Sequence, residues 1–303
     1  MRPPILIAGP TASGKSELAL ALAERDGGCV INADALQVYS CWRVLTARPS
    51  AADERRAPHR LYGTVARESA YSVGDWLRDA AEVLAECRKL HLRPIFVGGT
   101  GLYFSALTEG LAAIPQVSAE IRVLGNTIRE TEGASGFVRR LADLDPETLA
   151  QTDRNNAVRL QRAWEVATGT GRGLASWQRD TGPPLLPMER ARAVVLRSDP
   201  AKANTRISAR LERMICEGAL EECAAAMAVG WSPALQSARA LGAPELVSHL
   251  AGEISLEAAK EKIVVKTRRY AKRQRTWFRN RMANWTWLDA AHCEAAELAR
   301  QIE

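Results

Sequence analysis

Eight residues near the amino terminus have the composition and spacing of a phosphate-binding loop. The sequence Gly-Pro-Thr-Ala-Ser-Gly-Lys-Ser at residues 9–16 fits the pattern G-x-x-x-x-G-K-[ST]. Glycines let backbone amides turn towards phosphate oxygens, the lysine adds positive charge, and the last hydroxyl can reach a phosphate-bound Mg²⁺. We therefore predict that a diphosphate or triphosphate binds here, and that these residues contact it: Gly9, Thr11, Ala12, Ser13, Gly14, Lys15 and Ser16, with Ser16 also the metal ligand.

Two further polar residues follow apolar, strand-like segments. Asp34 comes shortly after the apolar residues 29–31, and Thr100 comes shortly after residues 94–97. The carboxyl ends of parallel strands face the ligand crevice of such sheets. Asp34 there could ligate a metal, accept a proton from a nucleophile or cap the following turn. The Thr100 hydroxyl could face the crevice or bond its own backbone. The residues alone leave these roles open.

The segment after residues 94–97 also lacks a feature of many P-loop enzymes. It reads Gly-Gly-Thr-Gly and carries no carboxylate. P-loop NTPases that hydrolyse nucleotides usually have a second strand with an acid that manages Mg²⁺ and water. The absence argues against NTP hydrolysis. It leaves kinases and other transferases with a phosphate leaving group open.

The chain carries a basic segment near its carboxyl terminus. Between residues 262 and 281 there are three lysines and six arginines, no acidic residue, and the interleaved rings of Tyr270, Trp277 and Phe278. Such a helix is typical of contacts with phosphate backbones, with aromatic and arginine planes available to unstacked bases. The alternative is a solvated helix whose arginine stems pack on the core.

The pattern of apolar runs predicts the elements that position these groups. Four runs have the length of buried strands: 5–8, 29–31, 94–97 and 193–196. Helical patterns between the first three predict an α/β fold, with a parallel sheet flanked by helices. Prolines bound a mostly helical stretch at 113–190, which we predict to be an insertion into a core formed by 1–112 and 191–303. After residue 196 the pattern is helical to the end.

Composition and charge narrow the function classes. The chain has 303 residues, of which 47% are hydrophobic and 25% charged, which is ordinary for a soluble globular protein. Its net charge of +6 is modest. Its six cysteines are scattered without a C-x-x-C pair, so we expect neither a zinc site nor a disulfide framework. Residues 1–4 run directly into an apolar stretch, so we expect no secretory signal. No apolar run approaches the roughly 20 residues of a membrane span. We expect a cytoplasmic protein without membrane contact.

The motifs together carry a family resemblance. The chain resembles the bacterial tRNA dimethylallyltransferases essentially from end to end. The matching stretches are 9–16, 32–34, 37–39, 46–49, 58–59, 71–73, 97–103, 121–122, 159–166 and 267–279.

This resemblance implies a reaction, a cofactor and partners. It implies a P-loop NTPase-like core, Mg²⁺, and transfer of a dimethylallyl group from dimethylallyl diphosphate to N6 of adenosine 37 in tRNA. The insertion would help to grip the anticodon stem-loop, and we expect a monomer. By matching position, Asp34 would be the general base and Thr100 would contact the flipped adenosine. The residues expected to contact tRNA are Asp34, Ala35, Leu36, Gln37, Thr100, Arg122, Arg159, Arg162, Arg268, Arg269, Lys272, Arg273 and Arg275.

The chain departs from the family pattern at three places. Ala35 stands where the family usually has Ser, Leu45 replaces a common Gly, and Ala243-Pro244 replaces Tyr-Lys/Arg. These changes bear on anticodon-loop recognition.

Three other functions remain as alternatives. A nucleoside or nucleotide kinase would share the P-loop but not need the basic helix. A prenyltransferase for free adenine nucleotides would need neither that helix nor the insertion. A non-catalytic RNA-binding protein would leave the P-loop without a purpose.

Overall fold

The computed structural model describes residues 2–290 and 295–302 and divides the chain into two compact units. The first unit comprises Met1–Thr108 and Leu185–Glu303, and the second comprises Glu109–Pro184. The second unit is helical and is inserted into the first. Its bounds fall a few residues earlier than the 113–190 expected from the prolines.

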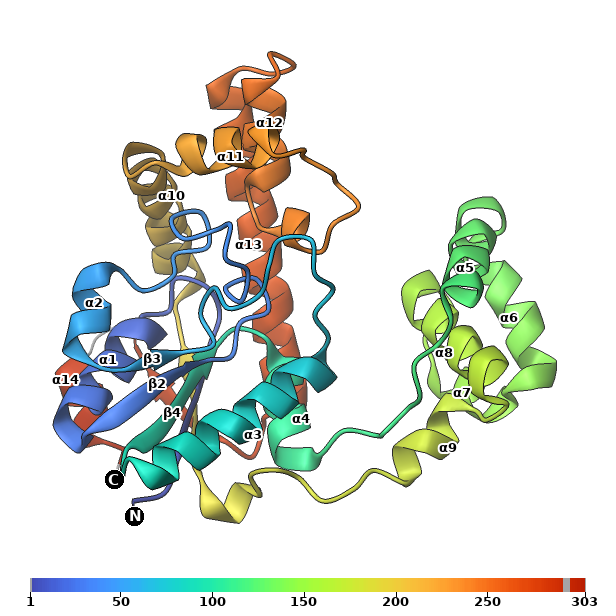
Figure 1. The fold of residues 1–303 in the computed structure, drawn as a ribbon, viewed down its shortest axis with the longest axis horizontal. Coiled ribbons are helices and arrows are strands. Elements are labelled where there is room, and N and C mark those ends of the chain that lie inside the picture. The colour runs from blue at the N-terminus through green and yellow to red at the C-terminus, as the bar shows by residue number, and fades with distance from the viewer. Residues whose placement is uncertain (1, 291–294, 303) are drawn as a thin grey trace. The chain divides into compact units, whose positions relative to one another are not determined.

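A parallel six-stranded sheet forms the centre of the first unit, which confirms the predicted α/β fold (Figure 1). The strand order is β3-β2-β4-β1-β5-β6, and each neighbouring pair is parallel. The strands are β1 (Ile5–Ala8), β2 (Gly28–Asn32), β3 (His59–Arg60), β4 (Arg93–Gly98), β5 (Arg192–Arg197) and β6 (Thr286–Asp289).

The four predicted strands are present as β1, β2, β4 and β5, whereas two edge strands were not predicted. The expectation of helix from residue 196 to the end is wrong at β6, where only Leu288 is buried. Its four residues carry too little apolar alternation to reveal a strand.

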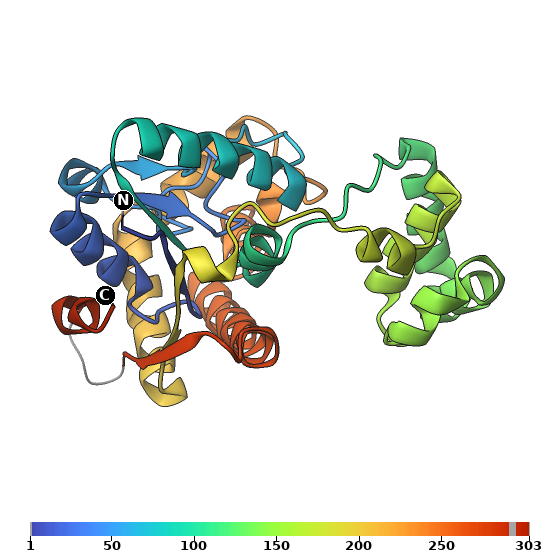
Figure 2. The ribbon, with the colours of Figure 1, turned by 90° about the horizontal axis from the view of Figure 1, so that it is seen from below.

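Helices cover both faces of the sheet, and successive strand residues point to opposite faces. Ile5 and Ile7 of β1 pack with α1 (Lys15–Asp26) and α14 (Ala295–Arg300). Leu6 and Ala8 belong to the other layer, with α3 (Val73–Lys89) and α4 (Gly101–Glu109). Figure 2 shows these two layers on either side of the strands.

Four further helices of this unit form a third cluster beyond the carboxyl ends of the strands (Figure 1). It joins α10 (Pro200–Cys216), α11 (Ala219–Ala228), α12 (Ala243–Leu250) and α13 (Leu256–Arg281) to the segment around the fully buried Trp42. Short elements complete the unit: α2 (Ala51–Arg56) and 3₁₀ turns at Met188–Arg190 and Ser237–Arg239. The basic segment therefore lies on α13, the longest helix of the described chain.

The second unit has a small core of its own, in which Phe137, Leu141 and Leu160 are fully buried. Its helices are α5 (Ala119–Thr131), α6 (Gly133–Leu144), α7 (Pro146–Gln151), α8 (Ala157–Thr170) and α9 (Leu174–Arg179). Asp145 caps α7 and also accepts the amide of Leu174 at 2.9 Å. None of the helices in the described parts of either unit is long and apolar enough to cross a membrane.

Candidate active site

The predicted phosphate-binding segment connects β1 to α1 and has the backbone of an anion cradle. Ala12 and Gly14 adopt positive φ angles, of 62° and 88°, which turn successive amides to one side. Gly14 precedes α1, and no side chain of the described residues caps that helix. Its first amides therefore remain available to an anion at the positive end of the helix dipole. A Cβ at Gly9 would lie 2.8 Å from the Ser13 hydroxyl oxygen, so the loop closes tightly at its start.

Two cations face the cradle from different helices. Lys15 places its ammonium 3.4 Å from the carbonyl oxygen of Pro10, and Arg210 of α10 places Nη1 3.5 Å from the Thr11 hydroxyl oxygen. Burial lowers the pKa of Lys15 to about 8; the Asp34 carboxylate opposes that fall and Arg210 adds to it. Burial also lowers the pKa of Arg210, again against Asp34. The two cations thus share a partly desolvated space, and a multiply charged anion bound there would neutralise their charge.

Asp34 is held at the carboxyl end of β2 by the buried side chain of Asn32. The side-chain oxygen Oδ1 of Asn32 accepts a hydrogen bond from the Asp34 backbone amide at 2.8 Å. The side-chain Nδ2 of Asn32 donates to the backbone carbonyl oxygens of Asp34 and Leu61, both at 3.0 Å. Asp34 Oδ1 accepts the Leu36 amide at 3.0 Å. Among the described residues Oδ2 has no hydrogen-bond donor. One oxygen caps the turn while the other stays available, so the cap and the base are compatible roles.

Thr100 lies beside Asp34 at the end of the adjacent strand β4. Its hydroxyl oxygen accepts the Ala35 amide at 2.9 Å, and its own amide donates to the carbonyl oxygen of Ala33 at 3.2 Å. A Cβ at Gly98 would lie 2.0 Å from that same oxygen, so the close approach of the two segments needs glycine. The structure therefore brings the two predicted catalytic residues together through the backbone of residues 33–35. The Thr100 hydroxyl keeps its proton for another acceptor.

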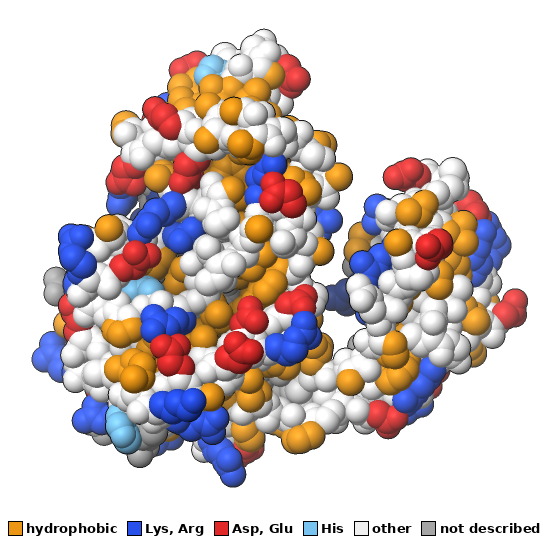
Figure 3. Space-filling view, viewed as in Figure 1, with side chains coloured by type: hydrophobic (Ala, Val, Ile, Leu, Met, Phe, Trp, Pro, Cys, Tyr) orange, Lys and Arg blue, Asp and Glu red, His pale blue; other side chains and the backbone are white. Residues whose placement is uncertain are grey.

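The cradle and Asp34 open into a cavity of about 1280 Å³ within the first unit. Leu36 and Gln37 also line it, but the Gln37 amide already donates to the carbonyl oxygens of Thr46 and Ala47, both at 2.8 Å. Figure 3 shows cations gathered over the α2 and α10 region. The lining cations beyond Lys15 are Arg43, Arg48, Arg56, Arg206, Arg210 and Arg213, and apolar lining residues include Ile207, Leu211, Met214 and Ile263. The cavity is thus large enough for a diphosphate ester with an apolar group and more.

Three tyrosines lie near the Asp34 carboxylate: Tyr103 is buried, and Tyr62 and Tyr270 are half-buried. Burial raises the pKa of Tyr62, Tyr103 and Tyr270, and the negative charge of Asp34 is the next cause in each case. Tyr62 and Tyr270 line the cavity. These phenols stay neutral near pH 7 and add no negative charge beside Asp34. Its charge interacts instead with the cations Lys15 and Arg210.

The cations of α13 divide into exposed and partly covered ones. Arg268, Arg269, Lys272 and Arg273 are exposed, and Arg275 is half-buried. Arg273 lies over the Tyr270 ring, 5.7 Å from its centroid. None of the five has an ion-pair partner within residues 2–290 and 295–302. They are therefore available to an anionic partner.

The other predicted cations lie in the second unit. Arg122 belongs to α5, and Arg159 and Arg162 belong to α8, which packs against it; all three are exposed. Burial lowers the pKa of Arg162, and Arg122 contributes to that fall, so these two cations lie near each other. The structure thus brings Arg122 and Arg162 together within the second unit.

Two of the departures from the family pattern, Leu45 and residues 243–244, lie close together. Leu45 and Ala243 are buried in one apolar cluster with Ile263. A Cβ at Gly242 would lie 3.2 Å from Leu45 Cδ1. Leu45 thus fills space beside residues 242–243. Ala35 is half-buried and contributes its amide to Thr100.

Two groups near the cradle were missed in the sequence. Arg210 lies on α10 with Arg206 and Arg213, at a spacing that puts all three on one helix face. That helix follows the carboxyl end of β5, so the spacing was an available signal. Gln274 accepts the Thr11 amide at 2.9 Å; this residue lies inside the basic segment, where its charged neighbours concealed it. The Thr11 amide is therefore already bonded, which leaves the Thr11 hydroxyl for an anion.

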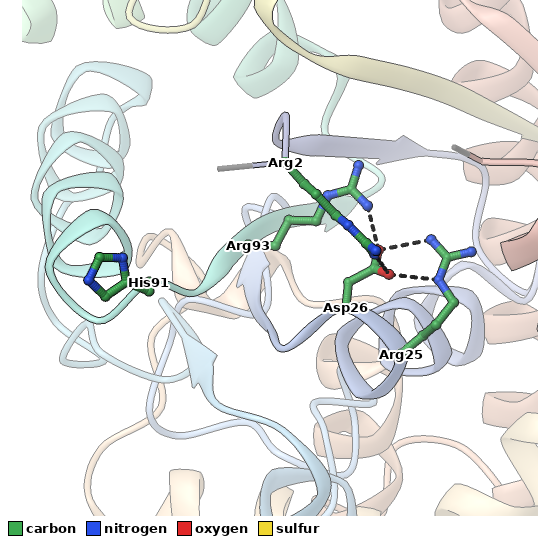
Figure 4. A pocket seen from close by; sticks show the side chains of 5 residues that line it. All are labelled: Arg2, Arg25, Asp26, His91 and Arg93. Atoms are coloured by element: carbon green, nitrogen blue, oxygen red, sulfur yellow. Dashed lines mark hydrogen bonds and ion pairs between the residues drawn. The ribbon is translucent and has the colours of Figure 1, made fainter.

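A second cavity, of about 350 Å³, lies at the amino ends of the strands. Figure 4 shows Arg2, Arg25 and Arg93 converging on Asp26, with His91 apart from them. The Asp26 side chain is 0% exposed, and Arg93 also donates to the carbonyl oxygen of Pro3 at 2.8 Å. This cluster is an ion-pair network around a buried carboxylate and the buried Arg93, at the end of the sheet opposite the crevice, and we assign it to stability.

The oxygen ligands that the protein offers at the crevice fit Mg²⁺ only together with phosphate oxygens. Within the described residues no group of three His, Cys, Asp or Glu side chains could hold a metal. The exposed Ser16 hydroxyl and Asp34 line the same cavity. A diphosphate in the cradle would supply the further oxygens that Mg²⁺ requires.

Comparisons with known proteins agree on one family. A family model described as IPP transferase matches residues 37–281, and one described as isopentenyl transferase matches residues 4–68. The chain is 58% identical over 282 residues to a tRNA dimethylallyltransferase of Cereibacter sphaeroides strain KD131, covering 93% of this chain and 87% of that protein. It is 56% identical over 286 residues to one from Dinoroseobacter shibae, covering 93% of each. The crystal structure of the tRNA isopentenylpyrophosphate transferase of Bacillus halodurans superimposes with a TM-score of 0.71 at 29% identity, covering 99% of this chain and 94% of that one.

Proposed function

Because the chain belongs to the tRNA dimethylallyltransferase family of prenyltransferases, we propose that it transfers a dimethylallyl group from dimethylallyl diphosphate to N6 of adenosine 37 in tRNA. The observation that carries this proposal is a juxtaposition in one cavity. A phosphate cradle with Lys15 and Arg210 lies beside a carboxylate oxygen of Asp34 that has no hydrogen-bond donor among the described residues. The tRNA substrate fits a cytoplasmic enzyme.

Asp34 would act as the general base. The exocyclic amine of adenine is a weak nucleophile because its lone pair is delocalised into the ring. As the nitrogen forms its bond to the allylic carbon, Asp34 Oδ2 accepts an N6 proton, while Oδ1 keeps its bond to the Leu36 amide. The bond from that carbon to the diphosphate oxygen breaks, and its electron pair leaves with the diphosphate. Such a positioned base contributes about 10²–10⁴-fold to rate.

The cradle would stabilise the leaving group. Negative charge grows on the diphosphate during transfer, and the amides at the start of α1, Lys15 and Arg210 are fixed in a partly desolvated space around it. Mg²⁺, held by diphosphate oxygens with Ser16, would neutralise further charge. No activated water is needed, which agrees with the Gly-Gly-Thr-Gly sequence after β4.

Binding of tRNA would offset the cost of exposing the base. An adenine must leave its stack to reach the cavity, at a cost of a few kcal/mol. The exposed cations of α13, and Arg122, Arg159 and Arg162 of the second unit, would contact the anticodon stem-loop. The Thr100 hydroxyl, whose proton is free, would donate to the flipped adenosine.

The rival functions explain less of the chain. A kinase would use the cradle, but not the cations of α13. A prenyltransferase for free nucleotides would leave the second unit unused. The relatives of more than 50% identity are named for action on tRNA.

The test is prenylation of tRNA in a defined mixture. Purified protein, tRNA, dimethylallyl diphosphate and Mg²⁺ without ATP should yield N6-(dimethylallyl)adenosine, detected by mass analysis of nucleosides, and EDTA should stop the reaction. Phosphoryl transfer from labelled ATP, or prenylation of free AMP in place of tRNA, would contradict the proposal.

A further inference from the structure

Gln274 of α13 joins the phosphate cradle to the loop that carries Thr100. This residue is buried, with 6% of its surface exposed. Its Oε1 accepts the Thr11 amide at 2.9 Å, and its Nε2 donates to the carbonyl oxygen of Gly99, also at 2.9 Å. One planar amide thus links the segments that follow β1 and β4, the adjacent strands at the centre of the sheet.

The loop around Thr100 is fitted to α13 on both sides. A Cβ at Gly99 would lie 2.2 Å from Gln274 Nε2. A Cβ at Gly101 would lie 2.2 Å from the ring of Trp277. Gln274 and Trp277 are three residues apart and therefore occupy one face of the helix. The helix closes over the residues on either side of Thr100, so the position of this loop depends on α13.

We propose that Gln274 is a positioning residue for the transfer, which fixes the diphosphate in the cradle relative to the amine held by Asp34 and Thr100. This inference rests on the proposed function. The loop after β1 would bind the diphosphate with its leaving oxygen, and Thr100 lies on the loop after β4. The two Gln274 hydrogen bonds that connect these loops therefore set the distance between the reacting groups. A misplacement of about 1 Å can cost about 10²-fold in rate.

The amide group suits this role because it offers an acceptor and a donor at once. A leucine offers neither. An ionised glutamate can accept the Thr11 amide, but it places a carboxylate oxygen against the Gly99 carbonyl oxygen. A protonated glutamate recovers both bonds with nearly the same shape. These differences make the role testable by chemistry as well as by deletion.

The same helix also presents the cations expected to bind tRNA. Lys272 and Arg273 are exposed and immediately precede Gln274. A tRNA bound to these side chains would hold the helix that carries Gln274. Correct geometry between the two substrates would therefore be supported by the element that binds the RNA.

The experiment compares single-turnover prenylation by wild type, Gln274→Leu and Gln274→Glu at saturating substrates, with separate affinities for tRNA and pyrophosphate. We expect Gln274→Leu to slow the chemical step about 10- to 100-fold with little change in either affinity. We expect the rate of Gln274→Glu relative to wild type to rise as the pH falls. Gln236→Leu is the matched control, since this amide of the same unit accepts the Tyr39 hydroxyl and the Tyr71 amide; it should lower thermal stability without slowing the chemical step.

Each outcome decides the proposal. A wild-type rate in Gln274→Leu, or a loss explained fully by weaker pyrophosphate binding, contradicts the positioning role while leaving the proposed function intact. If Gln274→Leu does not fold, a Gln274→Glu rate that shows no recovery at low pH contradicts it as well. An inactive wild-type protein contradicts the proposed function and this inference together.

Discussion

The hydroxyl oxygen of Thr100 accepts the backbone amide of Ala35 at 2.9 Å, directly beside the proposed base Asp34. This bond joins the ends of β2 and β4, and the Thr100 amide adds a second one to Ala33. The neutral hydroxyl and the carboxylate are therefore parts of one bonded unit. A change at Thr100 should act on Asp34 as well as on any base that Thr100 contacts.

Replacement of Thr100 should distinguish the contribution of its hydroxyl group to the reaction from that of its methyl group. Thr100→Val keeps the shape but leaves the Ala35 amide unpaired, which costs about 1–3 kcal/mol when buried. We expect a chemical step about 10- to 100-fold slower in single-turnover prenylation. Thr100→Ser keeps donor and acceptor and should retain most of the wild-type rate. Equal rates for the two variants would show that the hydroxyl has no role.

Replacement of Asp34 should distinguish its role as a general base from its role in capping the following turn. In Asp34→Asn the side-chain carbonyl oxygen can still accept the Leu36 amide, but the side chain cannot take a proton. Folding and tRNA affinity should be near normal, and the chemical step should slow by about 10²–10⁴-fold, or roughly 3–5 kcal/mol of barrier. Retention of more than about a tenth of the rate would remove Asp34 as the base, and recovery at high Mg²⁺ would make it a metal ligand.

The central strands were predictable because their signals are local. Ile5–Ala8 is a fully buried run between Pro4 and Gly9, so composition and flanking residues define it. The edge strand His59–Arg60 has two half-buried polar residues and exists only through its pairing with β2. Its sequence holds no pattern that could predict it.

The candidate site was predictable where one motif carries it and hidden where distant segments meet. The cradle and Asp34 follow strand ends, so their sequence neighbours identify them. Arg210 reaches Thr11 from α10, and Gln274 reaches it from α13. Both contacts depend on how helices far along the chain pack against the sheet, which periodicity does not specify.

Diphosphate binding should weaken as the pH rises above 8. Burial lowers the pKa of Lys15 to about 8, so the ammonium loses its proton above this pH in the free enzyme. A bound diphosphate favours the charged form, and binding then requires proton uptake. Titration calorimetry with pyrophosphate across pH 7–9.5 should show a falling affinity for wild type relative to Lys15→Arg, which stays charged. A constant ratio between the two would contradict the lowered pKa.

Asp26 should be important for stability and irrelevant to chemistry. Its 0% exposed carboxylate pairs with Arg2, Arg25 and the buried Arg93, so Asp26→Asn removes the carboxylate partner of the buried Arg93. We expect a loss of about 3 kcal/mol in the free energy of unfolding, measured with urea. Glu24→Gln, which breaks the half-exposed pair with Arg56, should have little effect.

The pH dependence of that stability has a definite sign. The hydrogen bond from Arg25 is the main cause that lowers the pKa of Asp26 in the folded protein. The unfolded state therefore binds the proton more readily, and the stabilisation is present above the ordinary carboxyl range and lost as the pH falls below about 4. The difference in unfolding free energy between wild type and Asp26→Asn should shrink there. A constant difference down to pH 3 would refute the ion-pair assignment.

The exposed cations of α13 should contribute to tRNA affinity through phosphate contacts, and the salt dependence of binding can count them. Arg268, Arg269 and Lys272 are exposed and have no ion-pair partner among the described residues. Their replacement by alanine should weaken tRNA binding and reduce the slope of log K against log salt by about 0.7–0.9 for each lost phosphate contact. The matched control removes Arg55, Arg88 and Lys89, which are also exposed, also two arginines and one lysine, and lie on α2 and α3. If both triple variants change the slope equally, the effect reflects net charge; if neither changes it, α13 is a solvated helix and the RNA is bound elsewhere.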